Sequence, residues 1–286
     1  MQPRELTIKT RGLKFAAQEW GDPRGNPVLA LHGWLDNSAS FTPLAPKLEG
    51  VRLIAVDLAG HGLSQHRPRG FSYDVWHYVE DLVDIAEALR LVRFGLIGHS
   101  MGGVISTMAA ASVFKEQLST IILIDGISPT PRLPAEAPLS LAQYIEQRRT
   151  PAEQLTVARY RSKKQAIRAR AIGQYKVSRA SSELLVDRSI RQEGDDWLWT
   201  SDPRLKLASP TRFTLEQSLS FIQAVQCPAS VVYARAGEIS GYITTHQQKM
   251  NNFQCYPVPG THHLHMDGYV DTVADVVNTA FGEVVW

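Results

Sequence analysis

Short runs of consecutive apolar residues recur along the chain, and segments with apolar residues at helical spacing separate most of them. Strands that are buried on both faces of a parallel sheet have this continuous apolar pattern. The predicted strands, most of which have this pattern, are residues 28–31, 51–56, 94–97, 120–125, 229–234 and 253–258. The predicted helices are residues 73–90, a helix directly after Ser100, and residues 214–225, 243–250 and 270–281. This alternation predicts an α/β fold with a mostly parallel, doubly wound sheet, whose ligand site lies beyond the carboxyl ends of the strands.

The N-terminal quarter of the chain predicts three more elements. Residues 6–10 and 13–20 flank an Arg-Gly turn and predict an antiparallel hairpin of edge strands, which brings the sheet to eight strands. Residues 36–38 are Asp, Asn and Ser, the residue types that cap the N-terminus of a helix. We therefore expect a helix from there to about Leu48.

The pattern changes after Ser128, where four prolines fall within ten residues and no buried strand pattern follows until about residue 210. We therefore expect a core domain made of residues 1–128 and 214–286. Residues 129–213 are expected to form a helical cap inserted between strands six and seven. Three aromatic residues of this region either line a pocket from above or hold the cap's own small core together, namely Trp197, Trp199 and Phe213.

Charge is divided unevenly along a chain whose formal net charge is +2. Residues 130–213 contain 16 Lys and Arg against 9 Asp and Glu, a net charge of +7, and the rest of the chain carries −5. Solvated helix faces would explain this excess, and so would attraction of an anionic substrate group. Because no nucleic-acid-binding motif accompanies the charge, we expect no nucleic-acid partner.

The composition is that of a globular protein, with 286 residues of which 44% are hydrophobic. Cys227 and Cys255 border apolar runs, where a free thiol packs as a small hydrophobic side chain. The N-terminus has no apolar signal-peptide region, and no run of eighteen apolar residues occurs. We expect a cytoplasmic protein, monomeric or homodimeric, without a membrane partner.

The candidate nucleophile lies in the motif Gly98-His99-Ser100-Met101-Gly102, between a predicted strand and a predicted helix. G-x-S-x-G in this setting is typical of a nucleophile elbow, a sharp turn that exposes the serine hydroxyl. The helix that follows directs unpaired backbone N–H groups toward an oxyanion formed on that serine. Ser100 is therefore the predicted nucleophile.

A second motif, His32-Gly33-Trp34, follows the strand at residues 28–31. In folds with this elbow, a loop at that place supplies one backbone N–H to the oxyanion, and the residue after the nucleophile supplies the other. The predicted donors are therefore Trp34 and Met101. We expect His32, Gly33 and His99, at the ends of predicted strands, to contact the substrate.

A serine hydroxyl needs a general base, and that base needs an acid to orient it. In chain order the acid comes second and the histidine last. The segment after the final predicted strand contains three histidines; the spacing favours His262, with His263 as the competing choice and His265 behind both. Their spacing on one loop suits metal chelation poorly, so we expect no metal site.

The acid is open between two residues. The turn after the strand at residues 229–234 is the usual place, and its only acid is Glu238. Asp125 ends the strand at residues 120–125 and also precedes His262. We favour Glu238, keep Asp125 as the alternative, and note that a chain with no acid in this role would bind a ligand without turning it over.

Four motifs together resemble those of the α/β-hydrolase superfamily with a lid. They are His32-Gly33-Trp34, Asp57-x-x-Gly60-His61-Gly62-x-Ser64, the elbow at Ser100, and His262-x-x-His265-x-Asp267. More narrowly, residues 32–37 and 197–210 resemble the serine hydrolase-like proteins. The sequence departs from its relatives at Gly237-Glu238, where they usually present a clearer acid.

The resemblance implies a serine hydrolase that cleaves an ester or related acyl bond of a small-molecule substrate, including an anionic one, without a cofactor. A haloperoxidase, a C–C bond hydrolase or a lyase would use the same triad. A ligand-binding protein that keeps the fold without turnover is the alternative from another class.

Overall fold

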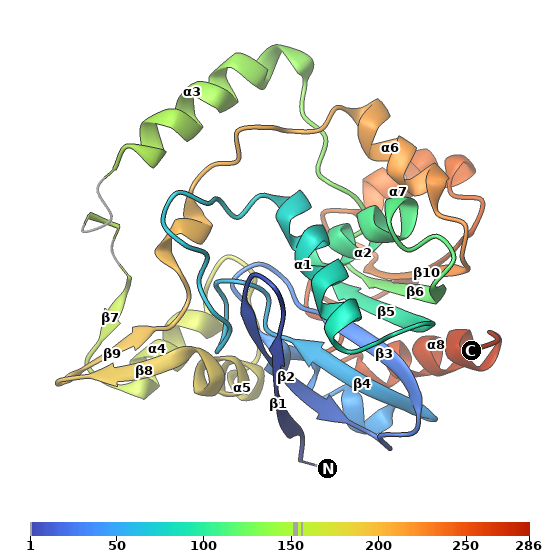
Figure 1. Ribbon diagram of the computed structural model, residues 1–286, viewed down its shortest axis with the longest axis horizontal. Helices are drawn as coiled ribbons and strands as arrows, with labels where there is room; N and C mark the ends of the chain where they lie inside the picture. The colour runs from blue at the N-terminus through green and yellow to red at the C-terminus, as the bar shows by residue number, and fades with distance from the viewer. Residues whose placement is uncertain (1, 151–153, 156) are drawn as a thin grey trace.

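The computed structural model describes residues 2–150, 154–155 and 157–286. Its centre is an eight-stranded sheet with the order β1-β2-β4-β3-β5-β6-β10-β11 (Figure 1). The strands are β1 Arg4–Lys9, β2 Lys14–Trp20, β3 Asn26–Leu31, β4 Val51–Val56, β5 Phe94–His99, β6 Leu118–Ile124, β10 Ala229–Ala234 and β11 Phe253–Val258. The predicted eight-stranded α/β fold is confirmed.

Parallel pairing dominates this sheet. Strands β4, β3, β5, β6, β10 and β11 pair in parallel, whereas β2 is antiparallel to both β1 and β4. The three central strands β3, β5 and β6 end at Leu31, His99 and Ile124. The residues that follow them directly are His32, Ser100 and Asp125. Because the strands are parallel, their carboxyl ends meet at one edge of the sheet.

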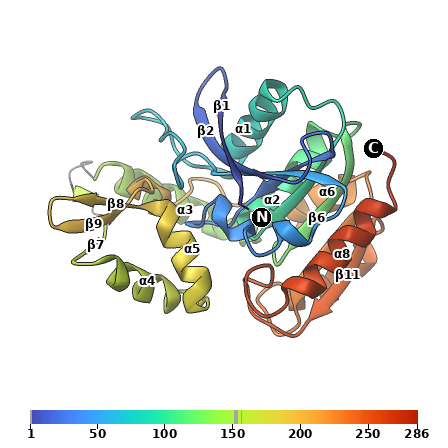
Figure 2. The same cartoon turned by 90° about the horizontal axis from the view of Figure 1, so that it is seen from below.

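Helices cover both faces of the sheet, which is why its inner parallel strands are mostly apolar and buried. One face packs against α1 (Val75–Ala88), α2 (Met101–Ser112) and α6 (Leu215–Ala224), with α7 (Ser240–His246) beside them. The other face packs against α8 (Val270–Gly282), which lies on the side opposite α1 in Figure 2. The sheet thus separates two apolar clusters, one on each face. Packing on both faces fixes the position of its carboxyl edge.

The expected helix between Asp36 and Leu48 is absent from this described stretch, where two short 3-10 turns stand instead. They are η1 (Ser38–Phe41) and η2 (Ala45–Lys47). The physical reason is Pro43 and Pro46, which lack the N–H that a continuous helix would need at those positions. The capping prediction itself holds at Asn37, whose side chain accepts a hydrogen bond from the N–H of Ala39.

We call residues 129–213 the cap segment. Its chain runs between β6 and β10, which are neighbours in the sheet. It contains η3 Pro134–Glu136, α3 Ala137–Arg148, β7 Arg159–Tyr160, α4 Lys163–Ala171, α5 Arg179–Ser189, β8 Ile190–Glu193, β9 Asp196–Trp199 and η5 Pro203–Lys206. The segment is thus not purely helical, because β7, β9 and β8 form a three-stranded antiparallel sheet beside α4 and α5 (Figure 1). The last short turn of the chain, η6 (Gln247–Lys249), follows α7.

Two arginines of the cap segment carry its positive charge into the core. Arg188 donates from Nε to Asp57 Oδ2 at 2.9 Å and from Nη1 to Glu5 at 2.8 Å, and Arg188 and Asp57 are both buried. Arg170 donates from Nη2 to Asp36 Oδ1 at 2.6 Å. Part of the charge imbalance therefore serves to hold the cap segment on the core, in addition to the solvated faces expected from the sequence.

Within the described ranges, no helix combines the length and the apolar character that spanning a membrane requires.

Candidate active site

Ser100 lies in the turn between β5 and α2 with φ 51° and ψ −114°, in the left-handed region that favours glycine. Its N–H donates to the carbonyl of Ile124 at 2.9 Å, and its carbonyl accepts from the N–H groups of Gly103 and Val104. These backbone bonds fix the turn from both sides. Ser100 therefore stands between the end of a buried strand and the N-terminus of a helix, as the G-x-S-x-G motif predicts.

The two motif glycines are required by close backbone approach. A Cβ on Gly98 would lie 2.4 Å from the carbonyl oxygen of Gly102, and a Cβ on Gly102 would lie 2.0 Å from that of Leu31. Both distances are far below van der Waals contact, and the obstacles are backbone atoms that cannot swing away. The motif therefore reflects the packing of the elbow against β3.

His262 is paired with Asp125. Its Nδ1 lies 2.6 Å from Asp125 Oδ2, and the other carboxylate oxygen of Asp125 accepts from the N–H of Ala234 at 2.9 Å. Asp125 follows β6 directly and is 3% exposed, and Ala234 is the last residue of the neighbouring strand β10. The side-by-side arrangement of β6 and β10 thus places this carboxylate beneath the histidine loop.

Glu238 has a different partner, although the sequence favours it as the acid. Its Oε2 accepts from the hydroxyl of Tyr175 at 3.2 Å, and its side chain is exposed. The ring of Tyr175 stacks on that of His262, with 4.1 Å between centroids and 27° between planes. Glu238 therefore reaches His262 only through a tyrosine of the cap segment, whereas Asp125 contacts it directly.

A cavity of about 590 Å³ joins the predicted residues. Ser100, His262, Trp34 and Met101 all line it, together with Asp125 and Glu238. The backbone N–H groups of Trp34 and Met101 have no acceptor among the residues of the described ranges. Of the three aromatic residues expected in the cap, Phe213 lines this cavity and Trp199 lines the neighbouring one described below.

Backbone strain is concentrated around this cavity. Four non-glycine residues of the described chain have positive φ, and three of them are Leu35 at 62°, Ser100 at 51° and Asp125 at 46°. Each is at or next to a residue of the cavity wall. Such conformations cost of the order of 1–3 kcal/mol each and persist where the surrounding packing fixes them.

The three residues expected to contact the substrate, His32, Gly33 and His99, do not appear among the described residues that line the cavity. His32 is buried, donates from Nδ1 to the Gly33 carbonyl at 2.7 Å and accepts from the Leu58 N–H at 2.9 Å, so its ring is neutral and holds two loops together. Burial lowers the pKa of His32 to about 4.

Gly33 and His99 act on the loops in a similar way. A Cβ on Gly33 would lie 2.9 Å from His99 Nδ1, so the glycine allows that ring to pack under the loop. His99 is fully buried, and its Nε2 lies 3.0 Å from the carbonyl of His262. Burial holds the pKa of His99 well below its usual range, so the neutral ring donates to this carbonyl and steadies the loop that carries His262.

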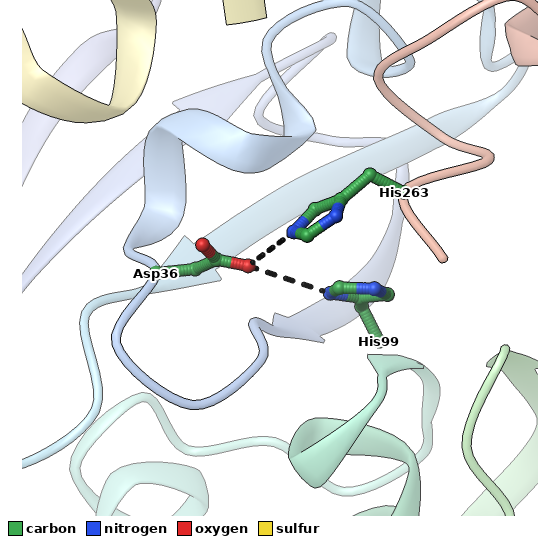
Figure 3. Close-up of side chains that lie close together, drawn as sticks. All are labelled: Asp36, His99 and His263. Carbon is green, nitrogen blue, oxygen red and sulfur yellow. Dashed lines mark hydrogen bonds and ion pairs between the residues drawn. The ribbon is translucent and has the colours of Figure 1, made fainter. Parts of the chain in front are cut away.

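Behind the cavity lies a second cluster, formed by Asp36, His99 and His263 (Figure 3). Asp36 Oδ2 is 3.0 Å from His263 Nε2 and 3.7 Å from His99 Nδ1. Their possible ligand atoms lie within 4.8 Å of one another, as a bound metal ion would require. Arg170 Nη2 already lies 2.6 Å from Asp36 and 3.2 Å from His263 Nε2, so a cation would have to displace the guanidinium.

The charge state of this cluster follows from its surroundings. Burial alone would raise the pKa of the Asp36 carboxyl, but His263 and the Arg170 guanidinium more than offset that effect and hold it well below its usual range. Asp36 is therefore an ionised carboxylate with cationic and hydrogen-bonding partners on both sides. It lies two residues after Trp34, so the cluster also fixes the loop that carries this predicted oxyanion donor.

Sequence reasoning missed Arg170 and Tyr175. Arg170 donates from Nη1 to the carbonyl of Tyr175 at 2.9 Å, so a single guanidinium holds both Asp36 and the backbone of the residue stacked on His262. One arginine among many in a basic segment carries no distinguishing pattern. Asp36 was visible only as a helix cap, and its pairing with His263 depends on loops that are 227 residues apart.

The fold and the site define a class of protein. A model of the alpha/beta hydrolase fold family matches residues 26–268, and the chain belongs to this family. The family and the names of the relatives support a hydrolase.

Among known proteins the chain is similar to the serine hydrolase-like protein of Danio rerio, at 30% identity over 266 residues, which cover 89% of this chain and 81% of that protein. A serine hydrolase-like protein of Dictyostelium discoideum is 29% identical over 95% of this chain and 80% of its own length. The crystal structure of a hypothetical protein from Pseudomonas aeruginosa PAO1 superposes with a TM-score of 0.92 at 36% identity, over 99% of this chain and 100% of that chain.

Proposed function

We propose that this protein hydrolyses an ester or related acyl bond of a small molecule, with Ser100 as nucleophile, His262 as general base and Asp125 as the acid. The observation that carries the proposal is the 2.6 Å contact between His262 Nδ1 and Asp125 Oδ2, on a ring that shares one cavity with Ser100. Asp125 fixes the proton on Nδ1, which leaves Nε2 free to accept the proton of the serine hydroxyl.

The reaction proceeds in two halves. Ser100 Oγ attacks the acyl carbon while His262 accepts its proton, and the tetrahedral oxyanion receives hydrogen bonds from the N–H groups of Trp34 and Met101. His262 then donates the proton to the leaving oxygen, the C–O bond to the leaving group breaks, and an acyl-enzyme remains. Water attacks the acyl-enzyme by the same steps and releases the acid with Ser100 restored.

The leaving group and the attacking water are expected to pass beside Tyr175, because its ring covers one face of His262. Burial, together with Glu238, raises the pKa of Tyr175, so its hydroxyl stays neutral at neutral pH. In this proposal Glu238 helps to hold Tyr175 over the base and takes no part in the proton transfer.

The proposal is tested with a p-nitrophenyl ester of a short acid and with a fluorophosphonate probe. Ser100→Ala is expected to lower kcat by about 10⁶ and to abolish labelling, because the nucleophile is lost. Ser106→Ala is the matched control, because Ser106 is buried within α2 and donates to the carbonyl of Gly102. Labelling that persists in Ser100→Ala, or a wild-type protein that neither labels nor turns over esters, would overturn the proposal.

A further inference from the structure

The cap segment contains a second cavity of about 300 Å³. Four aromatic side chains line it, namely Trp34, Tyr160, Tyr175 and Trp199. Two of their polar atoms are already hydrogen-bonded: Trp34 Nε1 donates to the Leu205 carbonyl at 3.0 Å, and Trp199 Nε1 donates to the Tyr160 hydroxyl at 3.3 Å. The ring faces are therefore what this cavity offers to a ligand. Offset and edge-to-face contacts with another aromatic ring are the arrangement that such faces favour.

The two cavities adjoin each other. Trp34, Tyr175 and Lys206 line both of them. Trp34 carries one predicted oxyanion donor and Tyr175 stacks on His262, so this boundary lies next to the proposed reacting centre. A ligand that fills the cap cavity can therefore extend past these three residues toward Ser100.

The charges of the two cavities differ. The described residues around the cap cavity include Arg170 and Lys206 but neither Asp nor Glu. The cavity that contains Ser100 is lined by Asp74, Asp125 and Glu238 as well as by Lys206 and Arg212. Arg170 is balanced by Asp36 at 2.6 Å. Lys206 is exposed and forms no ion pair with any residue that the structure describes. The boundary thus holds one cation whose charge is available to a ligand.

We propose that the cap cavity binds the aromatic end of an ester substrate, and that the Lys206 ammonium binds a carboxylate placed between this aromatic end and the reacting carbonyl. The position of the reacting carbonyl rests on the proposed function of Ser100. The binding of the aromatic and anionic groups does not depend on it. The substrate class is a monoester of an aryl-substituted dicarboxylic acid, in which the free carboxylate and the ring are attached to neighbouring or identical carbons.

Three esters of the same backbone separate the contributions of ring and charge. The 4-ethyl monoester of 2-phenylsuccinic acid carries both groups, ethyl 3-phenylbutanoate replaces its carboxylate with methyl, and the 4-ethyl monoester of 2-methylsuccinic acid replaces its ring with methyl. Dissociation constants are measured by calorimetry on Ser100→Ala, which holds the intact esters. We expect the phenylsuccinate monoester to bind about three- to fivefold more tightly than each of the other two, because an exposed charge pair and an aromatic contact each contribute on this scale.

Second substitutions in the Ser100→Ala background test the residues. Lys206→Gln is expected to remove the preference for the carboxylate and to leave the preference for the ring. Trp199→Leu is expected to do the reverse, and it keeps an apolar side chain in β9. Lys164→Gln is the matched control, because Lys164 is an exposed lysine of α4 that lines neither cavity, and it should leave both preferences unchanged. A thermal melt identifies any variant whose cap segment has unfolded, and Tyr160→Leu then takes the place of Trp199→Leu.

Equal affinities for the charged and neutral phenyl esters, or a charge preference that survives Lys206→Gln, would overturn the assignment. A ring preference that survives both Trp199→Leu and Tyr160→Leu would do the same. These results are independent of turnover: wild-type protein that fails to hydrolyse any of the three esters, with the binding preferences intact, would refute the proposed function and support the cavity assignment.

Discussion

Two adjacent histidines on one loop each pair with a buried aspartate, and their surroundings differ. His262 lies 2.6 Å from Asp125 and lines the cavity that contains Ser100. His263 lies 3.0 Å from Asp36 and is 1% exposed, and the Arg170 guanidinium lies 3.2 Å from the same ring nitrogen, Nε2. The same pair of side chains therefore borders a cavity in one case and is enclosed by the protein, with a cation beside it, in the other.

The comparison shows that a His–Asp contact does not by itself define a catalytic pair. What matters is the group that faces the second nitrogen of the ring. At His262 the ring meets Tyr175 and the cavity that contains Ser100, which is what the proposed proton transfer from Ser100 requires. At His263 the second nitrogen, Nδ1, is buried without a hydrogen-bond partner among the described residues, and Arg170 contacts Nε2 beside Asp36. This pair joins the cap segment to the core.

The largest predicted effect separates the two histidines. His262→Ala should lower kcat/KM for a p-nitrophenyl ester by about 10⁴- to 10⁶-fold, because the proposed general base is lost. His263→Ala should change it by less than about tenfold once the folded fraction is taken into account. Initial rates with circular dichroism of both variants provide the measurement. Losses of similar size would mean that the two pairs are not functionally distinct.

The second prediction separates the acids. Asp125→Asn should lower kcat by about 10³- to 10⁴-fold, since an asparagine stabilises the wrong tautomer of His262. Glu238→Gln should lower it by less than tenfold, because the glutamine can still bond the Tyr175 hydroxyl. Steady-state rates of both variants at pH 8 give the comparison. A larger loss of kcat in Glu238→Gln than in Asp125→Asn would identify Glu238, the acid favoured from the sequence, as the acid of the triad.

Most of the core could be predicted because its signals are local. The strands at residues 51–56, 229–234 and 253–258 have the predicted bounds. In the first two, the mostly apolar run ends where the buried part of the sheet ends. The three-stranded sheet of the cap segment was missed. Its strands are short, and only one of the ten residues in β7, β8 and β9 is buried, so no apolar run marks them.

Residues of the candidate site could be placed from the sequence only where a single local motif determines their conformation. Ser100 and its turn follow from five consecutive residues. The pairing of His262 with Asp125 depends on β6 lying beside β10, and no local pattern reports which strands are neighbours. The cluster around Asp36 is harder still, because it joins the loop after β3, the cap segment and the histidine loop.

The third prediction concerns stability and tests the role of the second pair. Arg170→Ala should lower the free energy of unfolding by about 3 kcal/mol, because it leaves the buried Asp36 carboxylate without its counter-charge. Arg168→Ala is the control, as Arg168 is an exposed arginine of the same helix with no ion pair among the described residues. Urea unfolding of both variants measures the difference. Equal midpoints would show that the Asp36–His263 pair does not need the guanidinium.

The smallest effect concerns a third histidine of the same loop, His265, which pairs with neither an aspartate nor an arginine of the described chain. It is fully buried, and neither ring nitrogen has a hydrogen-bond partner among the described side chains and backbone. Burial, reinforced by His263, lowers the pKa of His265 to about 3. The unfolded chain has the ordinary histidine pKa of about 6.5. Between these values the unfolded state binds a proton that the folded state does not, so stability is lost as the pH falls below about 6.5.

His265→Leu removes this proton uptake while keeping a buried apolar side chain beside Phe41. At pH 7.5 His265 is neutral in both the folded and the unfolded state. The free energy of unfolding of the variant should therefore differ from that of the wild type by less than about 1 kcal/mol. At pH 5 the wild type has lost about 2 kcal/mol through this histidine, because one pH unit corresponds to about 1.4 kcal/mol. The variant should therefore gain about 2 kcal/mol over the wild type between pH 7.5 and pH 5 in urea unfolding. A constant difference across that range would mean that the folded protein binds a proton at His265 as readily as the unfolded chain does. His265 would then have a polar partner, and all three histidines of this loop would be paired.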